Sequence, residues 1–201
     1  MEVKRRKKQP EASRLAILRA AGEGFALHGY AGTGIGWIAE RAGLTKGAIF
    51  HHFEDKRTLA VEWVREELAL GLEEEGAARF AALGSFSEWK QAGLGLLREM
   101  DGNHPIARLT LLGSETSHDE VLAAEIAQVA KVWRDGLAGG LEDGQAGGWI
   151  HRSIRPADEA VLLASLYSGL SMLVRVGGGP EVLRSAESAL GAYLDTLRGE
   201  G

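Results

Sequence analysis

Apolar residues recur along this chain at helical spacing, and no stretch alternates as a half-buried strand would. Glycine, proline and side chains suited to capping separate the apolar segments. We expect helices over residues 11–28, 34–41, 46–52, 55–82, 85–100, 105–112, 119–137, 156–176 and 180–197. The glycine-rich stretch 139–148 is expected to end or fray the seventh helix. The sequence therefore predicts an all-α fold of about nine helices.

Residues 33–59 have the spacing of a helix-turn-helix, a motif that offers one helix to a DNA major groove. At its corner a glycine stands where the chain must turn sharply with a positive φ. The threonine after the corner can cap the second helix through its hydroxyl. The positions that carry the pattern are Ile38, Ala39, Gly43, Leu44, Thr45 and Ile49. The other interpretation of this pattern is a tight corner in an ordinary helical bundle.

Charge is distributed unevenly along the 201 residues, whose formal net charge is −5. Residues 1–63 hold 11 Lys/Arg against 7 Asp/Glu, and the remainder holds 12 against 21. A basic first third joined to an acidic body indicates that only the first part meets a polyanion. Residues 1–10 are polar and basic, and we expect a flexible arm that reaches DNA or merely aids solubility.

The run from Ile38 to Phe53, followed by Lys56 and Leu59, resembles the TetR family of bacterial transcriptional repressors. The resemblance has specific motifs over about residues 11–60, and beyond them it rests on length and helical pattern. It implies a helix-turn-helix DNA-binding domain over residues 11–55 and a ligand-binding and dimerisation domain over residues 56–201. It also implies a double-stranded DNA operator and an unidentified small-molecule effector as partners.

The resemblance implies that the second helix of the motif faces DNA and that two flanking residues, Thr33 and Lys56, grip phosphates. Lys46 can donate to guanine or to phosphate, and a small residue lets the backbone approach DNA closely. At Phe50 the family usually has tyrosine, so Phe50 either touches a thymine methyl or packs. The expected DNA-binding residues are Thr33, Thr45, Lys46, Gly47, Ala48, Phe50, His51 and Lys56.

Several aromatic and polar residues fall on separate helices of the second domain and could line one apolar cavity. For each of them the simpler interpretation is a residue that fills the core. Arg108 stands in an apolar segment and could pair with a ligand anion or a helix carboxylate. The candidate ligand-binding residues are Trp89, Met100, His104, Arg108, Leu111, Trp133 and Tyr167.

The last two predicted helices carry apolar and small residues on more than one face. Paired with a symmetry mate they would form a four-helix interface, as the dimers of the resembled family do. Two copies for each operator also suit a motif that reads few base pairs alone. The candidate dimer residues are Leu166, Gly169, Leu170, Leu173, Ala186, Leu190 and Tyr193.

No catalytic or metal-binding pattern emerges, and the absence of cysteine excludes disulfides and thiolate sites. We expect no cofactor, no enzyme activity and no membrane span, and a cytoplasmic location. The sequence thus predicts a homodimeric repressor that a ligand releases from a palindromic operator. The alternatives are a ligand-independent DNA-binding protein or activator, a helical binding protein or enzyme with an incidental helix-turn-helix, and a membrane-surface protein that uses the basic arm.

Overall fold

The computed structural model describes residues 3–177 and 179–200, and helices dominate them. The segments α4, η1, α5 and η2 follow one another without a break and form one continuous helical rod, residues 56–78. The rod contains two π-helical turns, η1 and η2. With this rod counted as one helix, the described residues form nine helices, as the sequence predicts. The elements are α1 (Val3–Gly32), α2 (Ile35–Arg41), α3 (Lys46–His52), α4 (Lys56–Trp63), η1 (Val64–Leu68), α5 (Ala69–Glu73), η2 (Glu74–Ala78), α6 (Phe86–Arg98), α7 (Pro105–Glu115), α8 (Glu120–Ala146), α9 (Pro156–Arg175) and α10 (Pro180–Asp195).

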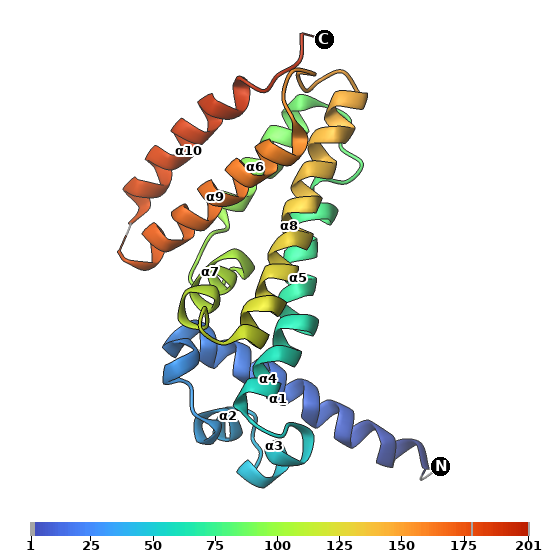
Figure 1. The fold of residues 1–201 in the computed structure, drawn as a ribbon, viewed down its shortest axis with the longest axis vertical. Helices are drawn as coiled ribbons and strands as arrows, with labels where there is room; N and C mark the ends of the chain where they lie inside the picture. The colour runs from blue at the N-terminus through green and yellow to red at the C-terminus, as the bar shows by residue number, and fades with distance from the viewer. Residues whose placement is uncertain (1–2, 178, 201) are drawn as a thin grey trace.

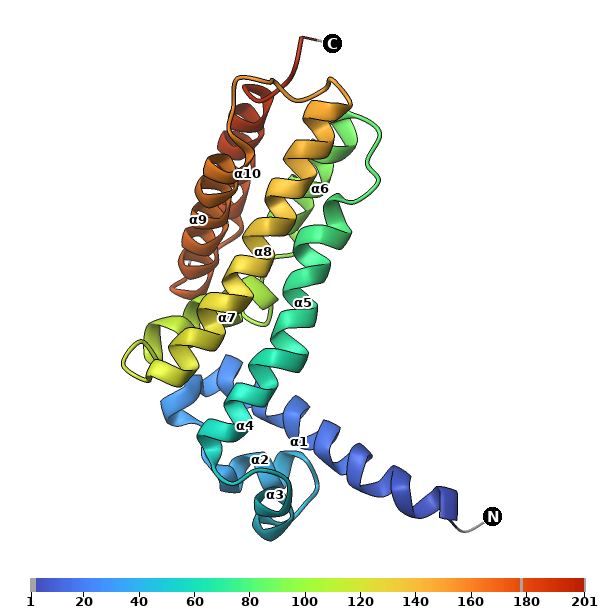
Figure 2. The same ribbon diagram turned by 45° about the vertical axis from the view of Figure 1, so that its right-hand side comes forward.

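The molecule is elongated, with α2 and α3 at one end and the C-terminus at the other (Figure 1). The rod α4–η2 and α8 lie side by side along the long axis, and α9 and α10 form one side of the body (Figure 2). α7 packs against α1, where the two ends of the molecule meet. The first half of α1 extends away from the other helices in both views.

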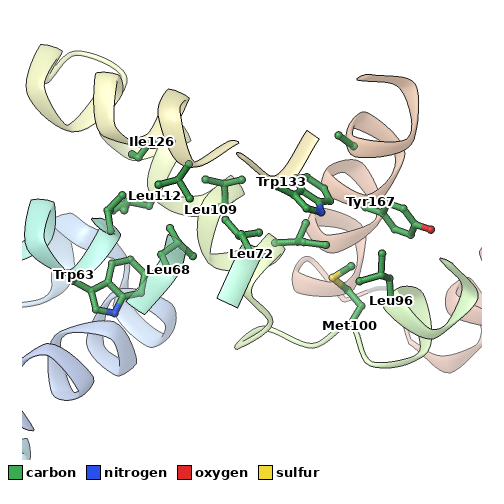
Figure 3. Close-up of a cluster of buried hydrophobic side chains, with 14 of the residues drawn as sticks. Trp63, Leu68, Leu72, Leu96, Met100, Leu109, Leu112, Ile126, Trp133 and Tyr167 are labelled. Atoms are coloured by element: carbon green, nitrogen blue, oxygen red, sulfur yellow. The ribbon is translucent and has the colours of Figure 1, made fainter. Parts of the chain in front are cut away.

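One continuous apolar core runs through both parts of the molecule. Figure 3 shows Trp63, Leu68 and Leu72 of the rod facing side chains from α7 and α8. Further along, Trp133 of α8 lies beside Tyr167 of α9. Burying such side chains stabilises the fold by about 1.5–3 kcal/mol each. The rod is therefore structurally part of both ends.

Side chains cap four of the predicted helices at their first turns. Thr45, Asp55, Ser85 and Asp119 each accept a hydrogen bond from a backbone N–H in the first turn of the helix that follows. Proline occupies the first turn of α7, α9 and α10, where its missing N–H costs nothing. These beginnings depend on neighbours in sequence, which explains why they could be predicted.

The first helix differs from its prediction. It begins at Val3 rather than Glu11, and Pro10 lies within it. The helix thus continues across Pro10, which has no backbone N–H to donate to the preceding turn. At Gly29 the backbone has φ 73° and ψ 171°, so the predicted stop is a sharp break before three more helical residues. The first two residues of the predicted arm lie outside the described residues.

Helix α8 ends within residues 139–148, as predicted, but it runs to Ala146 rather than stopping near Leu137. Three buried glycines four residues apart give the reason. A Cβ on Gly136 would lie 2.4 Å from the backbone N of Ala77, and one on Gly140 would lie 2.7 Å from Cβ of Phe80. At Gly144 it would lie 2.4 Å from Cγ1 of Ile150. The glycines let α8 approach its neighbours closely, and this packing outweighs their low helix propensity.

Helix α9 is unusually apolar for its exposure. By length and composition alone it could cross a membrane, and only 28% of its most apolar stretch is buried within this chain. Core helices of soluble proteins pass the same test, but those are mostly buried. Exposed apolar patches of this kind mark protein or membrane interaction sites.

Candidate nucleic-acid interface

The corner between α2 and α3 has the predicted geometry. Gly43 has φ +66°, its N–H donates to the carbonyl of Glu40, and the N–H of Leu44 donates to that of Ala39. This pair of bonds is the Schellman arrangement, which requires a left-handed residue after the helix. The Oγ1 of Thr45 then accepts from the N–H of Ala48 at 3.2 Å and starts α3. The corner thus fixes the direction in which α3 leaves α2.

Helix α3 is held by one face and free on the other. Ile49 and the adjacent Phe53 are fully buried against α1 and α2, together with Ile38 and Ala39 of α2. The residues on the free side that the sequence assigned to DNA are Thr45, Lys46, Gly47, Phe50 and His51, all exposed, and Ala48, which is half-buried. The anchoring leaves a continuous surface at the tip of the molecule.

Gly47 has no structural reason inside the chain. A Cβ at this position would meet only Oγ1 of Thr45, at an ordinary 3.8 Å. Glycine in a helix costs about 1 kcal/mol relative to alanine. Because no contact among the described residues requires glycine at this position, the glycine is best explained by another molecule that must approach the α3 backbone from outside.

The chemistry of the free face suits DNA. The stem of Lys46 lies over Gly36 of α2, and no carboxylate pairs with its ammonium in the part of the chain that the structure describes. Phe50 is 52% exposed, so it does not serve the core. His51 and His52 stack edge to face, and burial lowers the pKa of His52, with the charges of His51 and Arg14 adding to that effect. A cation, an apolar ring and imidazoles can contact phosphates and base edges.

The side chains of the two expected phosphate contacts, Thr33 and Lys56, both bond within the chain. Thr33 is fully buried, and its hydroxyl donates to the carbonyl of Gly29 at 2.6 Å. The ammonium of Lys56 donates to the carbonyls of Tyr30 and Thr33 at 2.8 and 3.1 Å and lies over the Tyr30 ring. Burial lowers the pKa of Lys56. The break at Gly29 leaves carbonyls without helical partners, and these two side chains bond to them instead of reaching outward.

Long-range polar contacts join this end of the molecule to the body. The carboxylate of Glu115 accepts from the N–H groups of Tyr30 and Ala31, directly after the break in α1. Arg57 pairs with Asp119, and the Nε of Arg65 donates to Glu125 at 2.9 Å. Sequence reasoning missed these contacts, because nothing local marks which charges meet across 60 or more residues.

The candidate ligand residues do not gather around one space. Met100, Trp133 and Tyr167 lie together in the core (Figure 3), and the Tyr167 hydroxyl donates to the carbonyl of Gly93 at 2.9 Å. Trp89 belongs to a separate aromatic group with Phe80, Phe86 and Trp149.

The remaining three candidates have structural surroundings of their own. His104 is buried, and its Nδ1 accepts from the N–H of Ile106, which caps α7. Its Nε2 lies 3.5 Å from Glu75, and burial lowers its pKa. Arg108 donates to Asn103, and Leu111 is half-buried on α7. Among the described residues, no group of three His, Asp or Glu could hold a metal ion.

The candidate dimer residues share an exposed apolar groove between α9 and α10. Its volume is about 410 Å³, and its walls are almost entirely carbon. Five of the seven candidates line it, together with Leu162 and Ala189; they are Leu166, Leu170, Ala186, Leu190 and Tyr193. Gly169 and Leu173 are exposed on α9 beside it. Leu190 also packs inside the chain, where it is buried.

Comparison with known proteins agrees with this architecture. Residues 17–62 match the family model described as "Bacterial regulatory proteins, tetR family". The chain is 44% identical over 61 residues to the HTH-type transcriptional repressor AcnR of Corynebacterium glutamicum, a match that covers 30% of this chain and 32% of that protein. It is 41% identical over 76 residues to the HTH-type transcriptional regulator AcrR of Shigella flexneri, with 37% and 35% covered. The matches thus span about a third of the length of these curated relatives.

Solved structures extend the similarity of fold to the whole chain. A TetR transcriptional regulator from Chloroflexus aurantiacus superposes with a TM-score of 0.79 at 24% identity, covering 96% of this chain and 98% of that one. A TetR-family regulator from Cytophaga hutchinsonii gives 0.82 at 17% identity with the same coverage. By sequence the helix-turn-helix over residues 17–62 thus belongs to the TetR family of bacterial regulatory proteins, and the chain as a whole has the fold of solved TetR-family structures.

Proposed function

We propose that this protein is a homodimeric, ligand-responsive transcriptional repressor. Each subunit would place the free face of α3 in a major groove of a palindromic DNA operator in the cytoplasm. The observation that carries the proposal is that face itself. It presents Thr45, Lys46, Gly47, Phe50 and His51 outward, while Ile49 and Phe53 bind the helix to the core from behind. Thr33 and Lys56 are left out of the proposed contacts, because both bond within the chain.

The apolar groove between α9 and α10 supports the homodimer. An exposed helix as apolar as α9 needs cover, and a second copy of α9 and α10 would supply an identical apolar face. A two-fold axis at this groove also gives two α3 helices per assembly. Such a pair reads half-sites about one helical turn, roughly 34 Å, apart. We propose the second copy rather than lipid as the cover, since both curated relatives named above are transcriptional regulators.

The rod α4–η2 supports the proposed response to ligand. It follows α3 directly and lies against α8 over most of its length. Its two π-helical turns are of a kind that often marks functional sites in helices. A ligand that binds one arrangement of the body more tightly would shift the population of dimers whose α3 helices match successive grooves.

A DNA-binding experiment tests the proposal. Wild-type protein would first select a fragment from its own genomic DNA, and fluorescence anisotropy would then measure affinity for that fragment across salt concentrations. Lys46→Ala should weaken binding about tenfold and lower the slope of log affinity against log salt by about one. Lys131→Ala, which removes an exposed lysine of α8, serves as the control and should change neither.

Lys46→Ala is the more informative of two possible substitutions, because Thr45 also caps α3 and its loss would weaken the helix by about 1 kcal/mol. Equal affinities for wild type and Lys46→Ala at every salt concentration would refute DNA binding through α3. Release of the selected DNA by at least one compound in a library screen is the result expected of a ligand-responsive repressor. A ligand-independent regulator or an activator would release it with none.

A further inference from the structure

A second, more polar groove lies between α7, α8 and α9, away from the apolar groove assigned to the dimer. Its volume is about 380 Å³, within the range of small-molecule sites, which is about 300–1,000 Å³. Leu109 and Val161 give it apolar walls, and Trp133 contributes an aromatic surface. Arg134, Ser165 and Ser168 supply its polar groups. Of the seven ligand candidates found in the sequence, only Trp133 lines it.

Arg134 lacks a partner that its position calls for. The residue is half-buried, yet within residues 3–177 and 179–200 no carboxylate lies within ion-pair distance of it. Other arginines of the body do have acidic partners, for example Arg79 with Glu75 and Glu99. A guanidinium withdrawn from water is stabilised by an anion and offers two parallel N–H donors to a carboxylate. The groove therefore has an unneutralised positive charge at its edge.

Trp133 lies beneath the groove, and its own unpaired donor faces the core. It is 1% exposed, and its Nε1–H has no hydrogen-bond partner in the described structure. Buried donors in native proteins are almost always bonded, and an unpaired one calls for an explanation. In Figure 3 its indole nitrogen lies on the side of the ring toward Tyr167 and Met100. Neither Tyr167 nor Met100 lines the groove, so the ligand is inferred from Arg134, whose N–H donors call for a molecule with acceptor oxygens.

We infer that this groove binds a small organic anion, a carboxylic acid with an apolar body. The carboxylate pairs with Arg134, and the apolar body lies along Trp133, Leu109 and Val161. The inference names the chemical class of the effector, and in that respect it rests on the proposed ligand response.

The groove is placed to influence the rod. A Cβ on Gly76, in the π-helical turn η2, would lie 3.1 Å from the carbonyl oxygen of Trp133 and 3.2 Å from its Cδ1. Any shift of the Trp133 ring or backbone therefore acts directly on η2. From η2 the rod continues without interruption to Lys56, four residues after the end of α3. A ligand in this groove thus has a packed route to the proposed DNA-binding helix.

Isothermal titration calorimetry of the full chain without DNA tests the site. The probes are 2-naphthoate and octanoate, each compared with its uncharged amide. We expect at least one carboxylate to bind and its amide to bind at least about tenfold more weakly, since a charged hydrogen-bonded pair is lost. Arg134→Met should cost about tenfold in affinity for the carboxylate, and Arg134→Lys should retain part of it.

Two further variants complete the test. Arg152→Met removes an exposed arginine from the loop before α9 and should leave affinity unchanged. Ser165→Trp adds a large ring at an exposed position of the groove and should abolish binding without unfolding the protein. Failure of both carboxylates to bind, equal affinity for acid and amide, or full affinity in Arg134→Met each overturns the inference. A changed mass of Ser165→Trp in light scattering with full carboxylate affinity would also overturn it, because the groove would then be an interface between copies.

These results are separable from those for DNA. Carboxylate binding that requires Arg134, in a protein that retains no genomic fragment, would leave the groove established and the repressor proposal refuted. Selection of DNA by a protein that binds neither carboxylate would support the repressor proposal and refute carboxylate binding in the groove.

Discussion

The two ends of this molecule are held together in different ways. In the helix-turn-helix end, the bonds that set the geometry join residues three to five positions apart, such as Thr45 with Ala48 and Leu44 with Ala39. In the body, the decisive contacts join residues far apart in sequence, such as Gly76 with Trp133 and Tyr167 with Gly93. The first end is therefore specified by local chemistry and the second by packing. Four experiments test this contrast, beginning with the largest expected effect.

Gly136→Val should give the largest loss of stability. The new Cβ would lie 2.4 Å from the backbone N of Ala77, and backbone cannot move aside as a flexible side chain can. Forcing α8 from the rod should destabilise the protein by about 3 kcal/mol. Urea denaturation measures the change. Gly139→Ala on the same helix meets nothing within 4 Å and should raise stability by about 0.5–1 kcal/mol. Similar stabilities for the two variants would mean that the helices do not pack this closely.

Glu115→Ala should loosen the joint between the two ends. It leaves the N–H groups of Tyr30 and Ala31 without their carboxylate acceptor. Loss of hydrogen bonds to a charged group should cost about 2 kcal/mol. Hydrogen exchange at these two amides should accelerate, while the amides of α3 change little. Glu115→Gln keeps an acceptor oxygen and should lose less; an equal loss in both variants would point to the charge alone.

Phe50→Tyr tests the chemistry of the DNA-facing end. Phe50 is 52% exposed, so a hydroxyl on its ring meets no packing constraint and stability should be unchanged. A new bond to a phosphate should tighten DNA binding by about 1 kcal/mol, or roughly fivefold. Anisotropy with the selected operator fragment measures it. Weaker binding by Phe50→Tyr would instead indicate that the unsubstituted ring touches an apolar group such as a thymine methyl.

The smallest effect is expected from the ion pair of Arg65 with Glu125, which is exposed to solvent on the arginine side. Arg65 lowers the pKa of Glu125 from its ordinary value of 4.5 by hydrogen bonding to it. A carboxylate with a lowered pKa contributes stability above the unfolded pKa and loses it as pH falls through the folded pKa. A double-mutant cycle with alanine at both positions should show weak coupling at pH 7 and less at pH 3. Equal coupling at the two pH values would show that the pair is not electrostatic.

Much of the helix-turn-helix end could be predicted, because its signals are local. The corner at Gly43, the caps at Thr45 and Asp55 and the buried positions Ile38 and Ile49 all appear in the structure as the sequence indicates. For Thr33 and Lys56 the structure shows bonds within the chain that the sequence did not indicate. Their surroundings depend on the break at Gly29 and on α4 returning beside it, and no spacing along the chain shows which carbonyls that return leaves exposed.

In the body, helix beginnings were predictable but helix length and partners were not. The stretch 139–148 predicts a helix end, because glycine is a poor helix former. Its spacing of four residues from Gly136 to Gly144 was the available sign of close helix packing. For the ligand candidates no such sign exists. No sequence signal distinguishes Trp89 from Trp133. Nevertheless, Trp89 lies in a separate aromatic group and Trp133 lines a groove.

By itself the sequence determined that this protein is all helical, where most of its helices begin, and which helix presents a polar and basic face. Those properties follow from periodicity, capping and charge, which act between neighbours. Only the tertiary structure decided that α8 passes through its glycines, that Thr33 and Lys56 serve the fold, and that Arg134 lies unpaired beside Trp133. Each of these depends on which surfaces from distant parts of the sequence pack together. That packing is selected by the free energy of the whole folded chain, which no local pattern reveals.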